Sequence, residues 1–441
     1  MRKEYTDILK LAWPVIIANL ISVSFYTIDT MMIGRLGSTA LAAVGLAGQL
    51  LNLTFFLSTA INAGTLALSA RRKGEEKEEE IFGVLANSIL LALVISLPLT
   101  LIFMIYPYPF FSIFVVEESV LREGAVYLSL SSLSIPLTFS VGIFSAAYRG
   151  VGDTLTPMII TFISGALKVV LNYLFIYGVY GFPYLGVVGL ALSTIIANAF
   201  SLSLFFITVY SGRFAIKASK HSRLLDFSIV KKIFSIGFPS LLEQASNQVA
   251  RLVYTAMVSS FGTEVLAAQE IGLRVESLSF MPGLGFSVAT ASLVGQSLGR
   301  GESITARRVF KAGAKMASLL MIFLGVFLFL AAEPLSKLFI EEETVIEYSV
   351  LYLRIMSFQQ PFLGLYMVYS GGLRGSGDTK SPFYASLISI WSLRIGLGYL
   401  LGFIFGWRVA GVWIGGLLDF ILRAIFLYYA YRIGRWEKIR L

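Results

Sequence analysis

The sequence contains no cysteine and only one histidine. Without cysteine the chain can form neither a disulfide bond nor a thiolate metal site, and a catalytic cysteine is excluded. The single histidine, His221, lies in the basic stretch "IKASKHSRLLDFS", where we interpret it as a solvated loop residue. Serine–histidine catalysis and histidine metal clusters inside an apolar segment therefore lack the residues they need.

Charged residues are also scarce. They make up 14% of the 441 residues, whereas 56% of the residues are hydrophobic. A soluble chain of this length is rarely so apolar. Hydrophobic runs of about 20 residues or more recur, and each is long enough to cross the roughly 30 Å hydrocarbon core of a bilayer as a helix. The runs do not alternate polar and apolar residues, so the sequence predicts helices rather than barrel strands. The expected fold is an all-α polytopic membrane protein.

We expect about twelve transmembrane helices. The first run follows "MRKEYTD" and continues past signal-peptide length without an A-x-A cleavage site, so we expect it to be a retained helix. The predicted spans lie near residues 8–34, 41–69, 81–105, 124–148, 157–179, 186–210, 233–260, 265–294, 308–331, 348–372, 382–405 and 409–431.

The net charge of +9 is concentrated in short loops beside these spans, where it indicates topology rather than nucleic-acid binding. If the N-terminus is cytoplasmic, the outer loops hold few basic residues: Arg35, Arg122, Lys337 and Arg408. The inner loops hold many more: Arg71, Arg72, Lys73, Lys77, Lys217, Lys220, Arg223, Arg300, Arg307, Arg308, Arg432, Arg435, Lys438 and Arg440. The asymmetry places both termini in the cytoplasm and the chain in a cytoplasmic (inner) membrane.

The chain contains an internal duplication. "YRGVGDTLTP" reappears as "LRGSGDTKSP", and Arg149 and Arg374 are separated by 374 − 149 = 225 positions. The same shift carries Pro14 onto Pro239 and Gly37 onto Gly262. The sequence therefore predicts two repeats of six spans. Because six is even, the repeats share one orientation and are related by a pseudo-two-fold axis along the membrane normal.

We predict an N-terminal lobe over residues 1–210, a basic cytoplasmic linker over 211–232 and a C-terminal lobe over 233–441. The RGxGDT turn, present in both lobes, has two interpretations. In the structural one, arginine complements the negative end of the preceding helix, and Asp153 or Thr156 caps the next helix before Pro157. In the functional one, the turn is a hinge at the cytoplasmic mouth.

These motifs resemble the multidrug and toxic compound extrusion (MATE) family, and the similarity covers nearly the whole chain. It rests on both RGxGDT turns and on "IDTMMIGRLGSTALAAVGL" from Ile28, "VVLNYLFIYG" from Val169, "GFPSLLEQ" from Gly237, "SLVGQSLGRGE" from Ser292 and "VAGVWIGGLL" from Val409. The resemblance implies two six-helix lobes around a central cavity. It also implies export of organic, often cationic, compounds in exchange for protons or sodium ions.

Ionisable residues inside spans are functional candidates by default, and the N-terminal lobe has two, Asp29 and Lys168. The resemblance places Asp29, with Pro14 in the same helix, in the family's cation or proton site. Lys168 and Asn172 are four residues apart and share one helix face. A buried lysine keeps its proton beside a carboxylate, so Lys168 either pairs with Asp29 or extends its ammonium group towards the membrane surface. Thr194 completes the predicted coupling site. Some relatives have aspartate at the position of Asn172, so this chain departs from a two-carboxylate sodium site.

The C-terminal lobe carries the predicted substrate-cavity residues: Glu243, Asn247, Arg251, Glu270, Gln359 and Arg394. Glu243 matches a family glutamate and starts a polar stripe of period four, so we expect it to contact cationic substrates. Some relatives have an aspartate in the tenth span, where this chain has Gln359 and Gln360 instead, which argues against a coupling site in the C-terminal lobe. We also expect charge pairs four residues apart, from Glu270 to Arg274 and from Asp419 to Arg423. Arg394 has no local partner and is expected to approach Glu243 or Glu270.

The leading function is therefore an ion-coupled efflux antiporter for small amphipathic organic cations, working by alternating access as a monomer in the bilayer. We expect no catalytic residue and no cofactor, and the metal question stays open. Protons are preferred to sodium as the coupling ion, because a single carboxylate can titrate whereas sodium prefers several oxygen ligands. The alternatives are a flippase for lipid-linked precursors, which the arginines Arg251, Arg354 and Arg394 would suit, and an intramembrane lipid enzyme.

The topology can be tested with accessibility tags at residue 220 and at the C-terminus. Both tags should be labelled only from the cytoplasmic side, because the basic loops stay there. Labelling of either tag from outside intact cells would contradict the arrangement of twelve spans.

Overall fold

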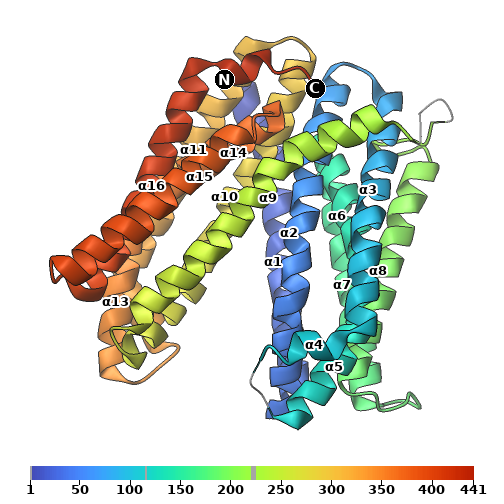
Figure 1. Ribbon diagram of the computed structural model, residues 1–441. Coiled ribbons are helices and arrows are strands. Elements are labelled where there is room, and N and C mark those ends of the chain that lie inside the picture. Colours follow the sequence, from blue (N-terminus) through green and yellow to red (C-terminus); the bar gives the residue numbers. More distant parts are fainter. Residues whose placement is uncertain (1, 115–116, 220–224) are drawn as a thin grey trace. The chain divides into compact units, whose positions relative to one another are not determined.

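The structure is a computed structural model that describes residues 2–114, 117–219 and 225–441 (Figure 1). His221, Lys220 and Arg223 of the predicted linker lie outside the described residues. Within the described ranges the chain forms helices joined by short turns, without strands. Helices satisfy their backbone hydrogen bonds internally, as apolar surroundings require.

The first half contains α1 (Arg2–Gly34), α2 (Ser38–Gly74), α3 (Glu78–Ile105), α4 (Pro107–Phe111), α5 (Glu118–Ser132), α6 (Ile135–Gly150), α7 (Leu155–Tyr177) and α8 (Val187–Tyr210). The second half contains α9 (Phe227–Ser259), α10 (Thr263–Gly299), α11 (Ser303–Leu330), α12 (Ala332–Lys337), α13 (Glu343–Ser357), α14 (Gln360–Ser376), α15 (Lys380–Ser389) and α16 (Arg408–Ile433). The π-helical segments η1 (Ile390–Leu397) and η2 (Leu400–Ile404) continue α15, and the 3₁₀ helix η3 (Arg435–Lys438) follows α16.

The helix boundaries confirm the duplication. The bounds of α2, Ser38–Gly74, shifted by 225 positions become Thr263–Gly299, the bounds of α10. The pairs α1 and α9, α3 and α11, and α5 and α13 obey the same shift at both ends. Each half therefore builds the same succession of helices from a different sequence.

Eight of the described helical segments are long and apolar enough to cross a membrane. Two further segments are bent by more than 40°, and counting each of them as one span brings the number to ten. The bent spans are α5 with α6, and α10. The remaining two predicted spans coincide with α9 and with α13 followed by α14. The all-α fold with twelve helical spans is confirmed.

The chain divides into two compact units, and each is described here by itself. Unit 1 comprises residues 1–16 and 238–441, and unit 2 comprises residues 17–237. The boundaries fall inside α1 and α9, close to Pro14 and Pro239, whereas the predicted lobes were divided at the linker. The first turns of α1 therefore belong to the same unit as α10 to α16.

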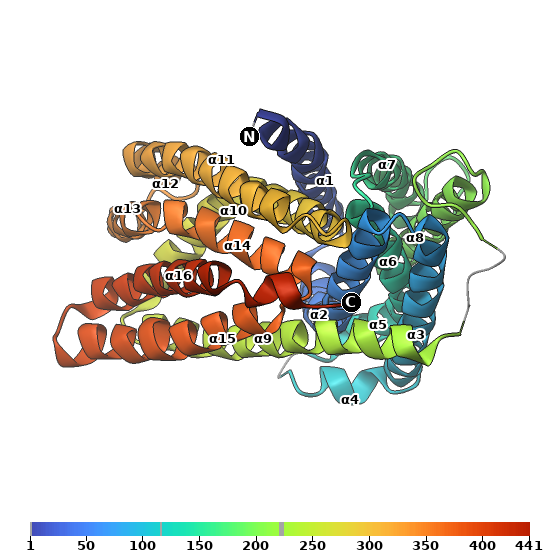
Figure 2. The same cartoon turned by 90° about the horizontal axis from the view of Figure 1, so that it is seen from above.

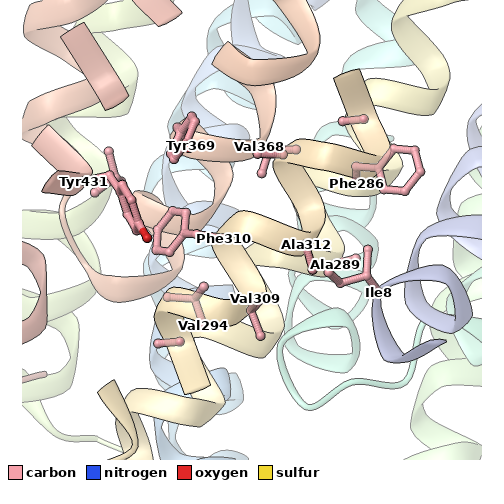
Figure 3. Close-up of a cluster of buried hydrophobic side chains, with 14 of the residues drawn as sticks. Ile8, Phe286, Ala289, Val294, Val309, Phe310, Ala312, Val368, Tyr369 and Tyr431 are labelled. Atoms are coloured by element: carbon pink, nitrogen blue, oxygen red, sulfur yellow. The ribbon is translucent and has the colours of Figure 1, made fainter. Parts of the chain in front are cut away.

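Unit 1 is built around α14, which packs against α10, α11 and α16 (Figure 2). Its core joins Phe286 of α10, Phe310 of α11 and Tyr431 of α16, and Ile8 at the start of α1 lies in the same cluster (Figure 3). The ring centroids of Phe310 and Tyr431 are 5.0 Å apart. Buried aliphatic and aromatic contacts of this kind attach the first turns of α1 to unit 1.

Unit 2 holds the first turns of α9 by close backbone contact. A Cβ atom added to Gly64 of α2 would lie 2.7 Å from the carbonyl oxygen of Ile233 in α9. A Cβ on Gly237 would likewise collide with the carbonyl group of Ala60. Small residues allow helices to approach this closely, as is common between membrane helices.

The Gly64 contact predicts that Gly64→Ala destabilises the protein, by about 1–3 kcal/mol, because the added methyl group overpacks the α2–α9 contact. Thermal unfolding in detergent should show a lowered midpoint. Gly45→Ala is the matched control, because Gly45 lies in the same helix with nothing within 4 Å of an added Cβ. Equal midpoints for the Gly64 variant and the unsubstituted protein would contradict the predicted overpacking.

Candidate functional site

Unit 2 contains a buried polar cluster built on Asp29 of α1. The ammonium group of Lys168 donates to Asp29 Oδ2 at 2.6 Å, and the side-chain amide of Asn172 donates to Asp29 Oδ1 at 2.6 Å. Asp29 is 9% exposed and Asn172 is fully buried. The structure confirms the predicted contact between Asp29 and Lys168, and Asn172 completes it from one turn further along α7.

This cluster has one unsatisfied acceptor. The side-chain oxygen of Asn172 is buried and has no hydrogen-bond partner in the described structure, although its amide nitrogen binds Asp29. Buried polar atoms are normally satisfied, often by water or a ligand. The cluster can therefore accept one further donor beside the carboxylate.

A pocket opens next to the Asp29 cluster within unit 2. It has a volume of about 460 Å³ and is lined by residues of α1 and α7 and by Arg35, which follows α1. The helical lining residues are Ile28, Met31, Met32, Val169, Val170, Tyr173 and Tyr177. Ile28 precedes Asp29 and Val169 follows Lys168 in the sequence. The lining is mostly apolar and aromatic, which suits an amphipathic organic molecule.

Two predicted members of the coupling site are not bonded to Asp29. The Thr194 hydroxyl donates to the carbonyl oxygen of Leu190 in its own helix, at 2.9 Å. Pro14 lies in the part of α1 that belongs to unit 1. Their predicted roles in coupling stay predictions.

In unit 1, Glu243 of α9 is 3% exposed and is paired with an arginine. Arg374 of α14 donates to Glu243 Oε2 at 2.7 Å. The Tyr366 hydroxyl at 3.1 Å and the Ser386 hydroxyl at 2.9 Å donate to Oε1. Arg374 is the arginine of the second RGxGDT turn, so this turn neutralises the family glutamate. The predicted contact of Glu243 with a cationic substrate would have to compete with this arginine.

The RGxGDT turns also show the predicted helix capping. Asp153 accepts from the backbone nitrogen of Thr156 at 3.0 Å and from its hydroxyl at 2.7 Å. Asp378 makes the same two bonds with Ser381, at 3.0 and 2.6 Å. The structural interpretation of the aspartates is therefore confirmed, while the hinge role stays a prediction.

A second charge cluster in unit 1 is centred on Asp419 of α16, which is fully buried. Arg423 donates to both oxygens of Asp419, at 2.7 and 2.8 Å, which confirms the pair expected from the four-residue spacing. The Arg394 Nε lies 2.9 Å from Asp419 Oδ2. Arg394 thus approaches Asp419, and the expectation that it would approach Glu243 or Glu270 was wrong.

The other predicted cavity residues occupy varied places in unit 1. Asn247 donates to the backbone of Glu243 at 2.9 Å, and Arg251 is exposed. Glu270 and Arg274 are both exposed, and no ion pair joins them. Gln359 is 2% exposed and donates to the carboxylate of Glu276.

Sequence reasoning did not select Glu276, although it is a buried carboxyl group in a predicted span. It lies in α10 near Glu270 and Arg274, which drew attention as a charge pair. Glu276 is 4% exposed, whereas Glu270 and Arg274 are both exposed. Over the described ranges, no three histidine, cysteine, aspartate or glutamate residues lie close enough to hold a metal ion.

Comparison with known proteins identifies the family. The family model described as MatE matches residues 14–174 and 239–400, two stretches whose starting points are again 239 − 14 = 225 positions apart. This chain belongs to the MatE family. The multidrug and toxic compound extrusion resemblance is therefore confirmed, and the chain is a multi-pass membrane transporter of that family.

The curated relatives align over almost the full length. The chain is 31% identical over 439 residues to the probable multidrug resistance protein NorM of Thermotoga maritima, covering 99% of this chain and 94% of the relative. It is 27% identical over 438 residues to the multidrug resistance protein NorM of Photobacterium profundum, covering 97% and 94%.

Solved structures share the fold. The Vibrio cholerae MATE transporter VcmN in its bent form has a TM-score of 0.91 at 21% identity, covering 98% of this chain and 97% of that one. A MOP superfamily transporter from Pyrococcus furiosus has a TM-score of 0.88 at 22% identity, covering 99% and 97%. Family membership thus rests on sequence, and these structures agree with it in fold.

The buried pair of Glu243 and Arg374 can be tested by single and double substitution. Arg374→Gln should destabilise the protein, towards the lower end of the roughly 3–5 kcal/mol typical of broken buried pairs, because Glu243 is left without a cation. Adding Glu243→Gln should restore much of the loss, since no buried charge then remains.

Thermal unfolding in detergent measures both effects. Glu333→Gln is the control, because Glu333 forms an exposed pair with Lys337 whose loss should cost little. A double variant as unstable as Arg374→Gln alone would contradict the pairing.

Proposed function

We propose that this chain is a secondary antiporter that exports small amphipathic organic compounds, mainly cations, by alternating access, driven by protons. The relatives named multidrug resistance proteins support the substrate class. The cluster of Asp29, Lys168 and Asn172 carries the proposal for coupling, because it places one carboxyl group in a buried site that has a single free acceptor.

The contacts of Asp29 favour a proton over a sodium ion. Both carboxylate oxygens already accept hydrogen bonds from nitrogen donors, and one donor is the ammonium group of Lys168. A sodium ion at this carboxylate would lie close to that positive charge and would find few free oxygens, whereas sodium needs several oxygen ligands. A proton can bind Asp29 directly, because it needs no coordination shell.

Protonation would also change what holds α1 and α7 together. A neutral Asp29 no longer attracts Lys168 as an ion, so the contact between the two helices weakens. A protonated carboxyl group is itself a donor, and the free oxygen of Asn172 can accept from it. Proton binding at Asp29 would therefore switch the α1–α7 contact between two arrangements, which is what a carrier cycle requires.

Of the three arginines that suit the flippase alternative, two are engaged in unit 1, while Arg251 is exposed. Arg394 is paired with Asp419, and the Arg354 guanidinium lies over the Phe329 ring at 5.5 Å. Arginines engaged in this way are less available for a phosphate. We further propose an inner-membrane location with both termini in the cytoplasm and a monomeric state.

Asp29→Asn should abolish proton-driven export in proteoliposomes while the protein stays folded and still binds substrate, because the amide cannot exchange a proton. Transport of a cationic dye under an imposed pH gradient, and separately under a sodium gradient, measures coupling. Dye binding to the detergent-solubilised variant measures substrate recognition.

Glu79→Gln is the matched control, since Glu79 is an exposed carboxyl group in the same unit. Full proton-driven export by the Asp29 variant would place coupling elsewhere. Export by the unsubstituted protein that follows only the sodium gradient would refute proton coupling altogether.

A further inference from the structure

Glu276 in α10 is a buried carboxyl group with neutral hydrogen-bond partners. The Tyr352 hydroxyl of α13 donates to Glu276 Oε2 at 2.9 Å, and the Gln359 amide, just before α14, donates to Oε1. Glu276 is 4% exposed, Tyr352 is 3% exposed and Gln359 is 2% exposed. The carboxyl group is therefore surrounded by residues of α10, α13 and the break before α14, all in unit 1.

The other buried carboxylates of unit 1 differ from Glu276 in their partners. Glu243 accepts from Arg374, and Asp419 accepts from Arg423. A buried carboxylate that is bonded to arginine is stabilised as an ion, because the opposite charge offsets the cost of removing it from water. Glu276 has no such bond, so its ionised form is the costly one.

The charged and titratable groups that face Glu276 come from three other elements. Tyr352 of α13 contacts it directly, and Tyr254 of α9 and Arg394 of η1 act on it electrostatically. Arg394 is the cation that acts on Glu276, but its Nε lies 2.9 Å from Asp419 of α16. Its guanidinium also lies over the Tyr254 ring at 5.7 Å. The positive charge of Arg394 is thus already engaged by another carboxylate.

The partners of Glu276 can satisfy both of its protonation states. A tyrosine hydroxyl and a glutamine side chain each contain a donor and an acceptor, whereas lysine and arginine contain only donors. The ionised carboxylate accepts from both, as in the structure. A protonated carboxyl group can instead donate to the Tyr352 oxygen after the hydroxyl rotates. The carboxyl group then keeps two hydrogen bonds, while the hydroxyl hydrogen of Tyr352 turns away from it.

Glu276 also lies beside a bend in one helix and is bonded to a residue in the break between two others. It directly precedes a 43° bend in α10 between Thr263–Ser277 and Ser279–Gly299, and Gln359 lies in the break between α13 and α14. Beyond the bend, the Ser279 hydroxyl is bonded to Gln360 at 3.0 Å. The hydrogen bonds of Glu276 therefore connect the bend of one span to the break of the other.

The duplication does not repeat this site. A shift of 225 positions places Leu51 in the place of Glu276 and Ser134 in that of Gln359, whereas Tyr352 corresponds to Tyr127. We infer that Glu276, with Tyr352 and Gln359, is a second proton-binding site, confined to unit 1 and separate from Asp29. Proton binding there changes the hydrogen bonds that join α10 to α13 and α14. Its use during transport rests on the proposed antiport, but proton binding itself does not.

Infrared difference spectroscopy of the purified full chain during a pH titration tests proton binding without transport. Asp29→Asn, which removes the proposed carboxyl site of unit 2, should still show the carbonyl band of a buried protonated carboxyl group, and adding Glu276→Gln should remove that band. In the same Asp29→Asn background, Glu264→Gln, which removes an exposed glutamate from α10, should keep it. A band that persists unchanged in the Asp29→Asn/Glu276→Gln variant overturns the inference.

Tyr352→Phe keeps the carboxyl group and removes one hydrogen bond, so it tests the site even if Glu276→Gln does not fold. Its carbonyl band should shift relative to the unsubstituted protein, and an unshifted band would overturn the assignment. In proteoliposomes, Glu276→Gln should lower the number of protons exchanged per substrate. If the unsubstituted protein exports no substrate, the proposed antiport fails, while the spectroscopic result on Glu276 still stands.

Discussion

The cost of burying an ionised side chain organises the polar interior of both units. In unit 2, Asp29 is held by Lys168. In unit 1, Glu243 is held by Arg374, and Asp419 is held by Arg423. Burying either ion of such a pair without its partner would cost free energy. The pairs that join two different helices also fix how those helices contact one another. Glu276 departs from this rule, because neutral donors replace the cation, and this departure is what makes it a candidate for proton binding.

The two halves share their helices but not their charges. The shift of 225 positions places Tyr254 at the counterpart of Asp29, Ala18 at that of Glu243 and Thr194 at that of Asp419. Backbone geometry tolerates many apolar sequences, so the duplicated scaffold survives while its polar residues diverge. The proposed proton site at Asp29 and the charge clusters of unit 1 are consequences of this divergence. A transporter built from repeats can in this way give its two halves different chemistry on one fold.

Small residues and prolines decide where the chain passes from one unit to the other. Pro14 and Pro239 occupy equivalent positions in α1 and α9, close to the unit boundaries. Proline removes a backbone hydrogen bond and weakens the helix locally. The part of a helix before the proline can therefore belong to one unit and the part after it to the other. The close contact of Gly64 with Ile233 attaches the first turns of α9 to unit 2. These turns therefore belong to a different unit from the rest of their helix.

The sequence alone determined the helical membrane fold, the duplication and its shift, because hydrophobic length and repetition are read along the chain. It also predicted the pair of Asp419 and Arg423, since a spacing of four residues fixes proximity within one helix. The pairing of Asp29 with Lys168 needed the family resemblance as well. Only the tertiary structure decided the other contacts between helices. Arg374 pairs with Glu243, and Arg394 pairs with Asp419. Gln359 donates a hydrogen bond to Glu276. Contacts between helices depend on the rotation of each helix about its axis and on the distance between helix axes. Neither quantity follows from the spacing of residues along the sequence.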